Sequence, residues 1–104
     1  MSDMKFQVVL DPDLEQILPR YFEIRLDELR QMEQAASTGD TETVRLLGHR
    51  LKGTGSSYGF SRLTELGAAI EVAGKGGQLD SAEPLIAEVR KYLENVEIIY
   101  GEQG

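Results

Sequence analysis

Apolar residues recur along most of this chain at the spacing of an amphipathic α-helix. Four stretches keep that spacing over three turns or more, and each places its apolar side chains on one face. The four stripes are Phe22, Leu26, Leu29, Met32 and Ala36; Val44, Leu47, Leu51, Thr54 and Tyr58; Leu63, Leu66, Ile70 and Ala73; and Ile86, Val89, Leu93, Val96 and Tyr100. Strand-like alternation is nearly absent. The pattern predicts an all-α domain.

Capping residues indicate where the helices begin and end. Asp11 before Pro12 is typical of a helix N-terminus, because the aspartate caps and the proline fits the first helical position. Gly39 is expected to end one helix and Asp40 to cap the next. Ser61 is the expected cap of a later helix. The helices are predicted over about 12–18, 19–37, 41–57, 62–75 and from about 81 onward.

The last helix is expected to be capped by Asp80 or Ser81, and Pro84 then falls in its first turn, where a missing N–H costs little. Short connections make successive helices antiparallel neighbours. The sequence therefore predicts an antiparallel up-down four-helix bundle with a short extra N-terminal helix. This bundle is expected over 11–100, after an extended lead-in (1–10) and before a C-terminal tail (101–104).

Composition excludes several functional classes. The 104 residues suffice for one domain with a modest core, and the absence of cysteine excludes disulfides and thiol chemistry. A net charge of −7 argues against nucleic-acid binding. No apolar run approaches the roughly 20 residues needed to cross a bilayer, and the N-terminus does not resemble a signal peptide. A cytoplasmic monomer without membrane contact is therefore expected.

His49 is the single histidine of the chain and lies in an unusual stretch. Residues 43–64 contain no aspartate or glutamate but carry four cations: Arg45, Arg50, Lys52 and Arg62. A segment of charge +4 in a chain of net charge −7 suits an anion beside the imidazole. One histidine and no cysteine cannot form the usual zinc site, so no metal site is expected.

The helical period predicts that His49 points to solvent, because Leu47 and Leu51 lie on roughly the opposite side of its helix. Its neighbours on the outer face are Arg45, Lys52, Gly53 and Ser56. Gly48 and Gly53 each weaken a helix interior by about 1 kcal/mol, which indicates that something approaches the backbone closely. A phosphoryl group with its donor protein fits, since neutral imidazole is a capable nucleophile.

The sequence His49-Arg50-Leu51-Lys52-Gly53, followed by Gly59, resembles the signature of histidine-containing phosphotransfer (HPt) domains. The resemblance implies that His49 is phosphorylated on Nε2 and that Lys52 holds the phosphoryl oxygens. It also implies that Gly53 and Gly59 keep the docking surface free of bulk. The partners would be response-regulator receiver domains and a sensor histidine kinase. The receiver domain would bring the Mg²⁺, so the chain needs no cofactor of its own.

Further residues near His49 are candidates for partner docking. Leu46 could anchor a partner's apolar surface, or it could pack against the short N-terminal helix. Arg45 could contact the phosphoryl group or remain solvated, and Ser56 could be a helix-end hydroxyl. Arg50 points about 100° away from His49, which favours electrostatic steering.

The functional prediction is a covalent phosphoryl carrier of a His–Asp phosphorelay, not an enzyme. A variant is the phosphoacceptor domain of a chemotaxis-type kinase on a separate chain. One alternative is a receiver-binding module or phosphate sink without productive transfer. Another is a hydrolase with His49 as general base, but 43–64 contains no carboxylate to orient the imidazole.

Overall fold

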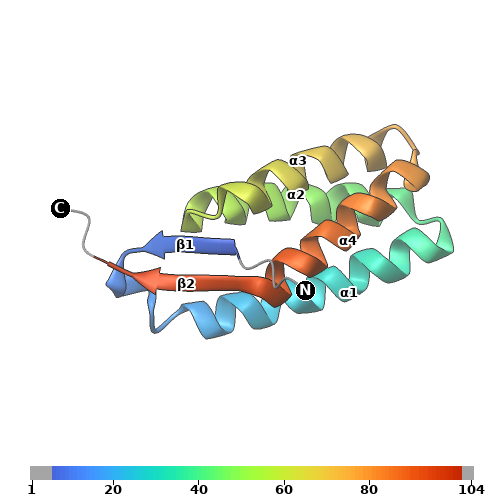
Figure 1. Ribbon diagram of the computed structural model, residues 1–104. Coiled ribbons are helices and arrows are strands. Elements are labelled where there is room, and N and C mark those ends of the chain that lie inside the picture. Colours follow the sequence, from blue (N-terminus) through green and yellow to red (C-terminus); the bar gives the residue numbers. More distant parts are fainter. Residues whose placement is uncertain (1–5, 102–104) are drawn as a thin grey trace, which may run out of the picture.

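The computed structural model describes residues 6–101, in which four helices pack side by side and two short strands lie at one end (Figure 1). The elements are β1 (Phe6–Leu10), a 3₁₀ turn (Pro12–Leu14), α1 (Leu18–Thr38), α2 (Thr41–Tyr58), α3 (Ser61–Lys75), α4 (Leu79–Asn95) and β2 (Val96–Tyr100). The predicted four-helix bundle is confirmed. Residues 1–5 of the expected lead-in and 102–104 of the expected tail lie outside the described residues.

The ends of the bundle differ from the sequence-based prediction. The prediction of a short N-terminal helix is wrong, because residues 12–14 form a single 3₁₀ turn. Residues 6–10 and 96–100 instead form a parallel two-stranded sheet, with Phe6 opposite Val96 and Leu10 opposite Tyr100. The last helix therefore stops at Asn95. Its expected continuation is rich in β-branched and aromatic residues, which favour strands once a partner strand is available.

Two of the predicted caps are confirmed. The carboxylate of Asp11 accepts a hydrogen bond from the backbone N–H of Asp13 at 2.8 Å, and that of Asp40 accepts one from Thr43 at 3.1 Å. Gly39 ends α1 with a φ of 80°, a left-handed conformation that glycine adopts without steric cost.

The predictions for the other two caps, Ser61 for α3 and Asp80 or Ser81 for α4, are wrong. α3 begins after Phe60, which makes no side-chain capping bond, and α4 begins after Gln78. Pro84 therefore lies in the second turn of α4, inside the helix, and not in its first turn. Phe60 instead contributes a fully buried ring, which stacks on Tyr21 at 5.4 Å between centroids. Burial of that ring determines the start of α3 more than a polar cap does.

The core lies between the four helices and contains most of the predicted stripes. Its fully enclosed side chains come from every helix: Leu18, Leu29 and Met32 from α1, Val44 and Leu51 from α2, Leu63 and Ile70 from α3, and Val89 from α4. No helix within residues 6–101 has both the length and the apolar character of a membrane span.

Four glycines form a seam where α2 and α3 touch backbone to backbone. Gly48 and Gly55 lie on α2, and Gly67 and Gly74 face them from α3. A methyl group added to Gly48 would lie 2.7 Å from the backbone nitrogen of Glu71, and comparable overlaps occur at the other three. The expectation that Gly48 makes room for a partner is therefore wrong: α3 occupies that space.

Candidate functional site

The imidazole of His49 projects from the outer face of α2, as the helical period predicted. Leu47 and Leu51 are buried on the inner face, whereas the side chain of His49 is 59% exposed. The ring is therefore accessible to another protein.

Glu71 of α3 organises this site. One of its carboxylate oxygens, Oε2, lies 3.0 Å from Nδ1 of His49, and the other, Oε1, lies 2.8 Å from Nζ of Lys52. A single carboxylate thus joins the imidazole and the lysine. Sequence reasoning missed it because Glu71 lies outside the acid-free segment 43–64. The objection that no carboxylate orients the imidazole is therefore wrong.

The glycine seam explains why Glu71 reaches both partners. Glu71 lies one turn after Gly67, and its backbone nitrogen borders Gly48, the residue next to His49. Because no side chain separates the two helices here, the carboxylate lies over the outer face of α2. In the sequence, Glu71 directly follows Ile70 of the apolar stripe. This position is the signal that the Glu71 side chain lies near a neighbouring helix.

The electrostatics of the site keep Glu71 charged near neutral pH. The hydrogen bond from Lys52 is the main cause that lowers the pKa of Glu71, and the hydrogen bond from His49 lowers it further, although desolvation acts in the opposite direction. A carboxylate accepts hydrogen bonds, so the neutral imidazole donates from Nδ1. The lone pair is then on Nε2, which has no hydrogen-bond partner among residues 6–101.

The cations of the 43–64 segment do not form an unbalanced positive patch. Each has a carboxylate partner: Arg45 pairs with Glu42 (3.1 Å), Arg50 with Glu28 (3.7 Å), Lys52 with Glu71 (2.8 Å) and Arg62 with Glu88 (3.5 Å). All four carboxylates lie outside the segment. The predicted anion-attracting patch is therefore wrong for Arg45, Arg50 and Arg62. The ion pair of Lys52 with Glu71 is the one that also contacts His49.

The remaining candidate residues lie on or beside the outer face of α2. Leu46 is 40% exposed and outside the core, so it does not pack against an N-terminal helix. Gly53 is exposed, and a side chain there would meet no atom within 4 Å. Ser56 is exposed near the end of α2. Gly59 ends α2 with a φ of 87°, a backbone reason for glycine at this turn.

The comparisons with known proteins agree with this arrangement. A protein-family model described as "Hpt domain" matches residues 16–98. No curated protein and no solved structure matches the chain. The matched residues include all four helices, His49, Lys52 and Glu71, whereas β1 lies before them.

Proposed function

This chain belongs to the Hpt domain family of histidine phosphotransfer proteins, which act in phosphorelays, and we propose that His49 is the residue that accepts its phosphoryl group. The observation that carries the proposal is the carboxylate of Glu71. It engages Nδ1 of His49, whose side chain is 59% exposed, so Nε2 is left as the nucleophilic atom for a partner.

The transfer step follows from this tautomer. Nε2 attacks the phosphorus of an aspartyl phosphate on a receiver domain, a P–N bond forms and the P–O bond to the aspartate breaks. The aspartate departs as a carboxylate with the bonding electron pair. The imidazole ring becomes positively charged while its hydrogen stays on Nδ1. Glu71 stabilises that charge at 3.0 Å, and no proton has to move. Transfer to a second receiver is the reverse of this step.

Lys52 has a second role in the proposal. Its ammonium group pairs with Glu71 at 2.8 Å, one helical turn from His49. A phosphoryl group on Nε2 adds anionic oxygens beside this half-exposed side chain. Lys52 then donates to those oxygens, because a flexible ammonium on a four-carbon stem rotates readily between neighbouring anions.

Hpt domains interact with receiver domains and kinases in two-component systems. For this chain, the receiver would supply the phosphoaspartate, the Mg²⁺ and most of the catalytic groups. The chain itself would serve as a covalent carrier. The partner would dock over Leu46, Gly53 and Ser56, with Arg45 and Gly59 at the margins of that surface.

The experiment is transfer from a ³²P-labelled receiver domain in the presence of Mg²⁺. We expect acid-labile, base-stable label on the wild-type chain and none on His49→Gln. Label on His49→Gln would refute the assignment. Saturable binding without any label would favour the binding-module alternative, and catalytic hydrolysis of a small substrate would favour the hydrolase.

Docking can be tested separately at Gly53. Gly53→Leu places a side chain in open space, so folding should be retained while receiver affinity falls. Lys91→Leu is the control for an added exposed leucine, because Lys91 is exposed on α4 and not on the helix that carries His49. Equal receiver affinity of Gly53→Leu and the wild-type chain would contradict a docking surface over this residue.

A further inference from the structure

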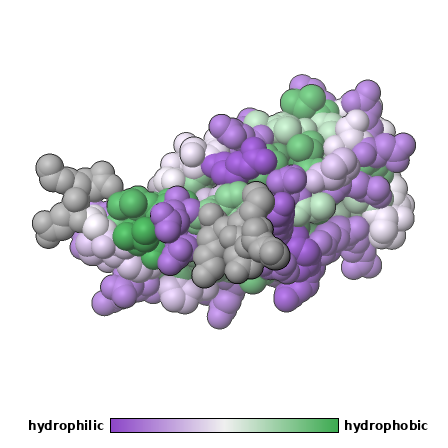
Figure 2. Space-filling view, in the orientation of Figure 1, coloured by the Kyte–Doolittle hydropathy of each residue, from purple (hydrophilic) through white to green (hydrophobic). Residues whose placement is uncertain are grey.

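The two-stranded sheet is the part of this fold that phosphotransfer does not use. β1 precedes the segment that matches the Hpt family, and it pairs with β2 from the other end of the chain. Two strands alone are marginal in water. At this end of the molecule, hydrophobic residues lie on the surface (Figure 2), among them Val9 and Ile99, exposed to 53% and 40%.

One edge of β1 has backbone groups without a partner among residues 6–101. The N–H of Gly101 donates to the carbonyl of Leu10 at 3.1 Å, so the backbone polar groups of Leu10 face β2. Successive residues of a strand direct these groups to alternate edges. The N–H and C=O groups of Gln7 and Val9 therefore face away from β2. The strand has no proline and no charged residue to block pairing at that edge.

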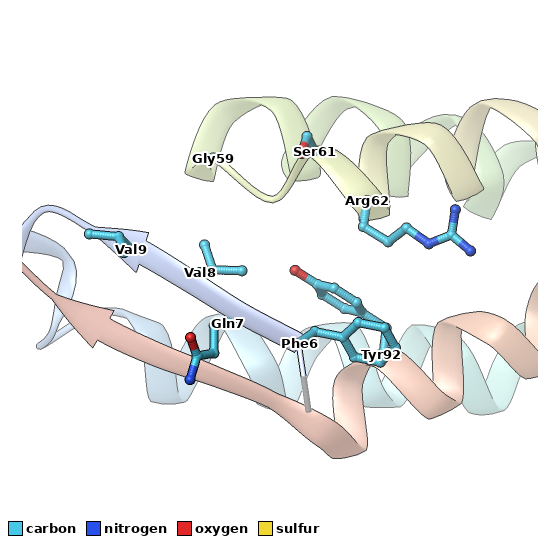
Figure 3. Close-up of a pocket in the computed structure, with 8 residues that line it drawn as sticks. All are labelled: Phe6, Gln7, Val8, Val9, Gly59, Ser61, Arg62 and Tyr92. Atoms are coloured by element: carbon cyan, nitrogen blue, oxygen red, sulfur yellow. The ribbon is translucent and has the colours of Figure 1, made fainter. Parts of the chain in front are cut away.

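A groove of about 440 Å³ runs along this free edge (Figure 3). Its walls are β1 on one side and the start of α3 on the other, with Gln7, Val9, Ser61, Arg62 and Tyr92 among the lining residues. A strand between a β-edge and a helix is a recurrent mode of peptide recognition, because the edge supplies backbone hydrogen bonds and the helix supplies side-chain contacts.

The polar groups in the groove indicate the chemistry of its occupant. Tyr92 is only 3% exposed, its ring packs on Phe6 at 5.1 Å, and its hydroxyl points into the groove. That hydroxyl makes no hydrogen bond to any residue in 6–101. Arg62 is the one charged lining residue. It forms long ion pairs with Glu65 and Glu88, at 3.6 Å and 3.5 Å, and its side chain remains 45% exposed, so a carboxylate in the groove would compete with these two glutamates for the guanidinium group.

We propose that this groove binds an extended segment of a partner protein, which adds to β1 as a third strand and places a carboxylate against Arg62 and Tyr92. An isolated segment fits better than a second copy of this chain. The β1 strand of a second copy has its own α3 beside the same edge, so two copies paired through β1 would place both helices in one space.

The groove also continues toward the proposed docking face. Gly59 and Ser61 line both this groove and an adjoining cavity that includes Ser56. A segment bound along β1 therefore lies next to a domain docked at His49. A partner that carries both elements gains affinity through effective concentration. The strand-addition site itself does not depend on phosphotransfer, and it is tested without it.

The test uses the full ¹⁵N-labelled chain and the peptide acetyl-Val-Thr-Val-Glu-Val-amide, with a glutamine-for-glutamate peptide as the matched control. We expect saturable shifts and slowed hydrogen exchange at the amides of Gln7 and Val9. The glutamate peptide should bind about threefold tighter at low salt, a difference typical of an exposed ion pair. Arg62→Gln should abolish that difference.

A second variant addresses the strand edge directly. Val9→Pro removes an outward N–H without removing a bond to β2, a position where edge strands tolerate proline. It should abolish peptide binding while the other amide signals stay in place. If Val9→Pro unfolds the sheet, the proposal is tested instead by hydrogen exchange at Gln7 and Val9 of the wild-type chain and by the peptide comparison with Arg62→Gln. Unchanged binding by Val9→Pro, or peptide shifts only elsewhere, would overturn the proposal. Slowed exchange at Gln7 and Val9 that rises with protein concentration in the absence of peptide would show that a second copy occupies the groove.

Discussion

Substitution of Gly67 by alanine tests whether the seam between α2 and α3 is as close as the structure shows. The added methyl group would overlap the backbone nitrogen of Lys52 and lie 2.8 Å from the carbonyl oxygen of Gly48 and 2.9 Å from Cα of Lys52. All three contacts involve backbone atoms. The helices must therefore move apart, because no side chain there can rotate away.

The expected loss in the free energy of unfolding of Gly67→Ala follows from two opposing effects. Overpacking of a well-packed interface costs about 1–3 kcal/mol, and contacts with rigid backbone place this case at the upper end. Alanine in place of glycine in a helix interior stabilises by about 1 kcal/mol. The net loss in the free energy of unfolding is then about 2 kcal/mol, which lowers the melting temperature of a domain of this size by about 10 °C.

Gly53→Ala is the matched control. It makes the same chemical change within α2, but no atom lies within 4 Å of the added methyl group. The propensity gain is then unopposed, and we expect about 1 kcal/mol of added stability and a melting temperature higher by about 5 °C. Urea unfolding followed by far-UV circular dichroism measures both variants. Equal stability of the two, or a Gly67→Ala chain as stable as the wild type, would refute the close contact.

Three further predictions concern charged residues. Lys52→Ala should slow phosphotransfer while the melting temperature stays within about 3 °C of the wild type, because the side chain is surface-exposed; a large thermal shift would contradict its placement. Glu71→Gln should slow phosphorylation of His49 by roughly tenfold, because a hydrogen bond to a charged group contributes about 1.5 kcal/mol, and the ring ¹⁵N shifts should show a loss of the Nδ1–H tautomer. The hydrogen bonds from Arg90, at 2.7 Å and 2.8 Å, lower the pKa of Glu33. This pair therefore stabilises the fold above the ordinary carboxylate range, and the effect is lost as the pH falls through the lowered pKa. Arg90→Gln should accordingly be less stable than the wild type at neutral pH, and the difference in urea unfolding should shrink as the pH is lowered through the acid range.

The sequence alone predicts the features that depend on local geometry. The four helices, the caps at Asp11 and Asp40 and the outward direction of His49 all follow from relations between residues at most a few turns apart. In an α-helix, the direction of a side chain is determined by its distance along the chain from the buried positions. The placement of Lys52 on the same face as His49 is predictable for the same reason.

The contacts that complete the site depend on residues far apart in the chain. Glu71 is 22 residues from His49, and no local pattern specifies that α3 lies close enough for their contact. The same holds for β1 and β2, which pair across 90 positions. It also holds for Gly48, whose missing side chain accommodates α3 and not a partner.

Sequence periodicity determined which side chains of this protein face outward, because a helix repeats its geometry every few residues. Tertiary structure alone decided which carboxylate meets the imidazole and pairs with Lys52. These two contacts depend on the distance between α2 and α3, which the four facing glycines set.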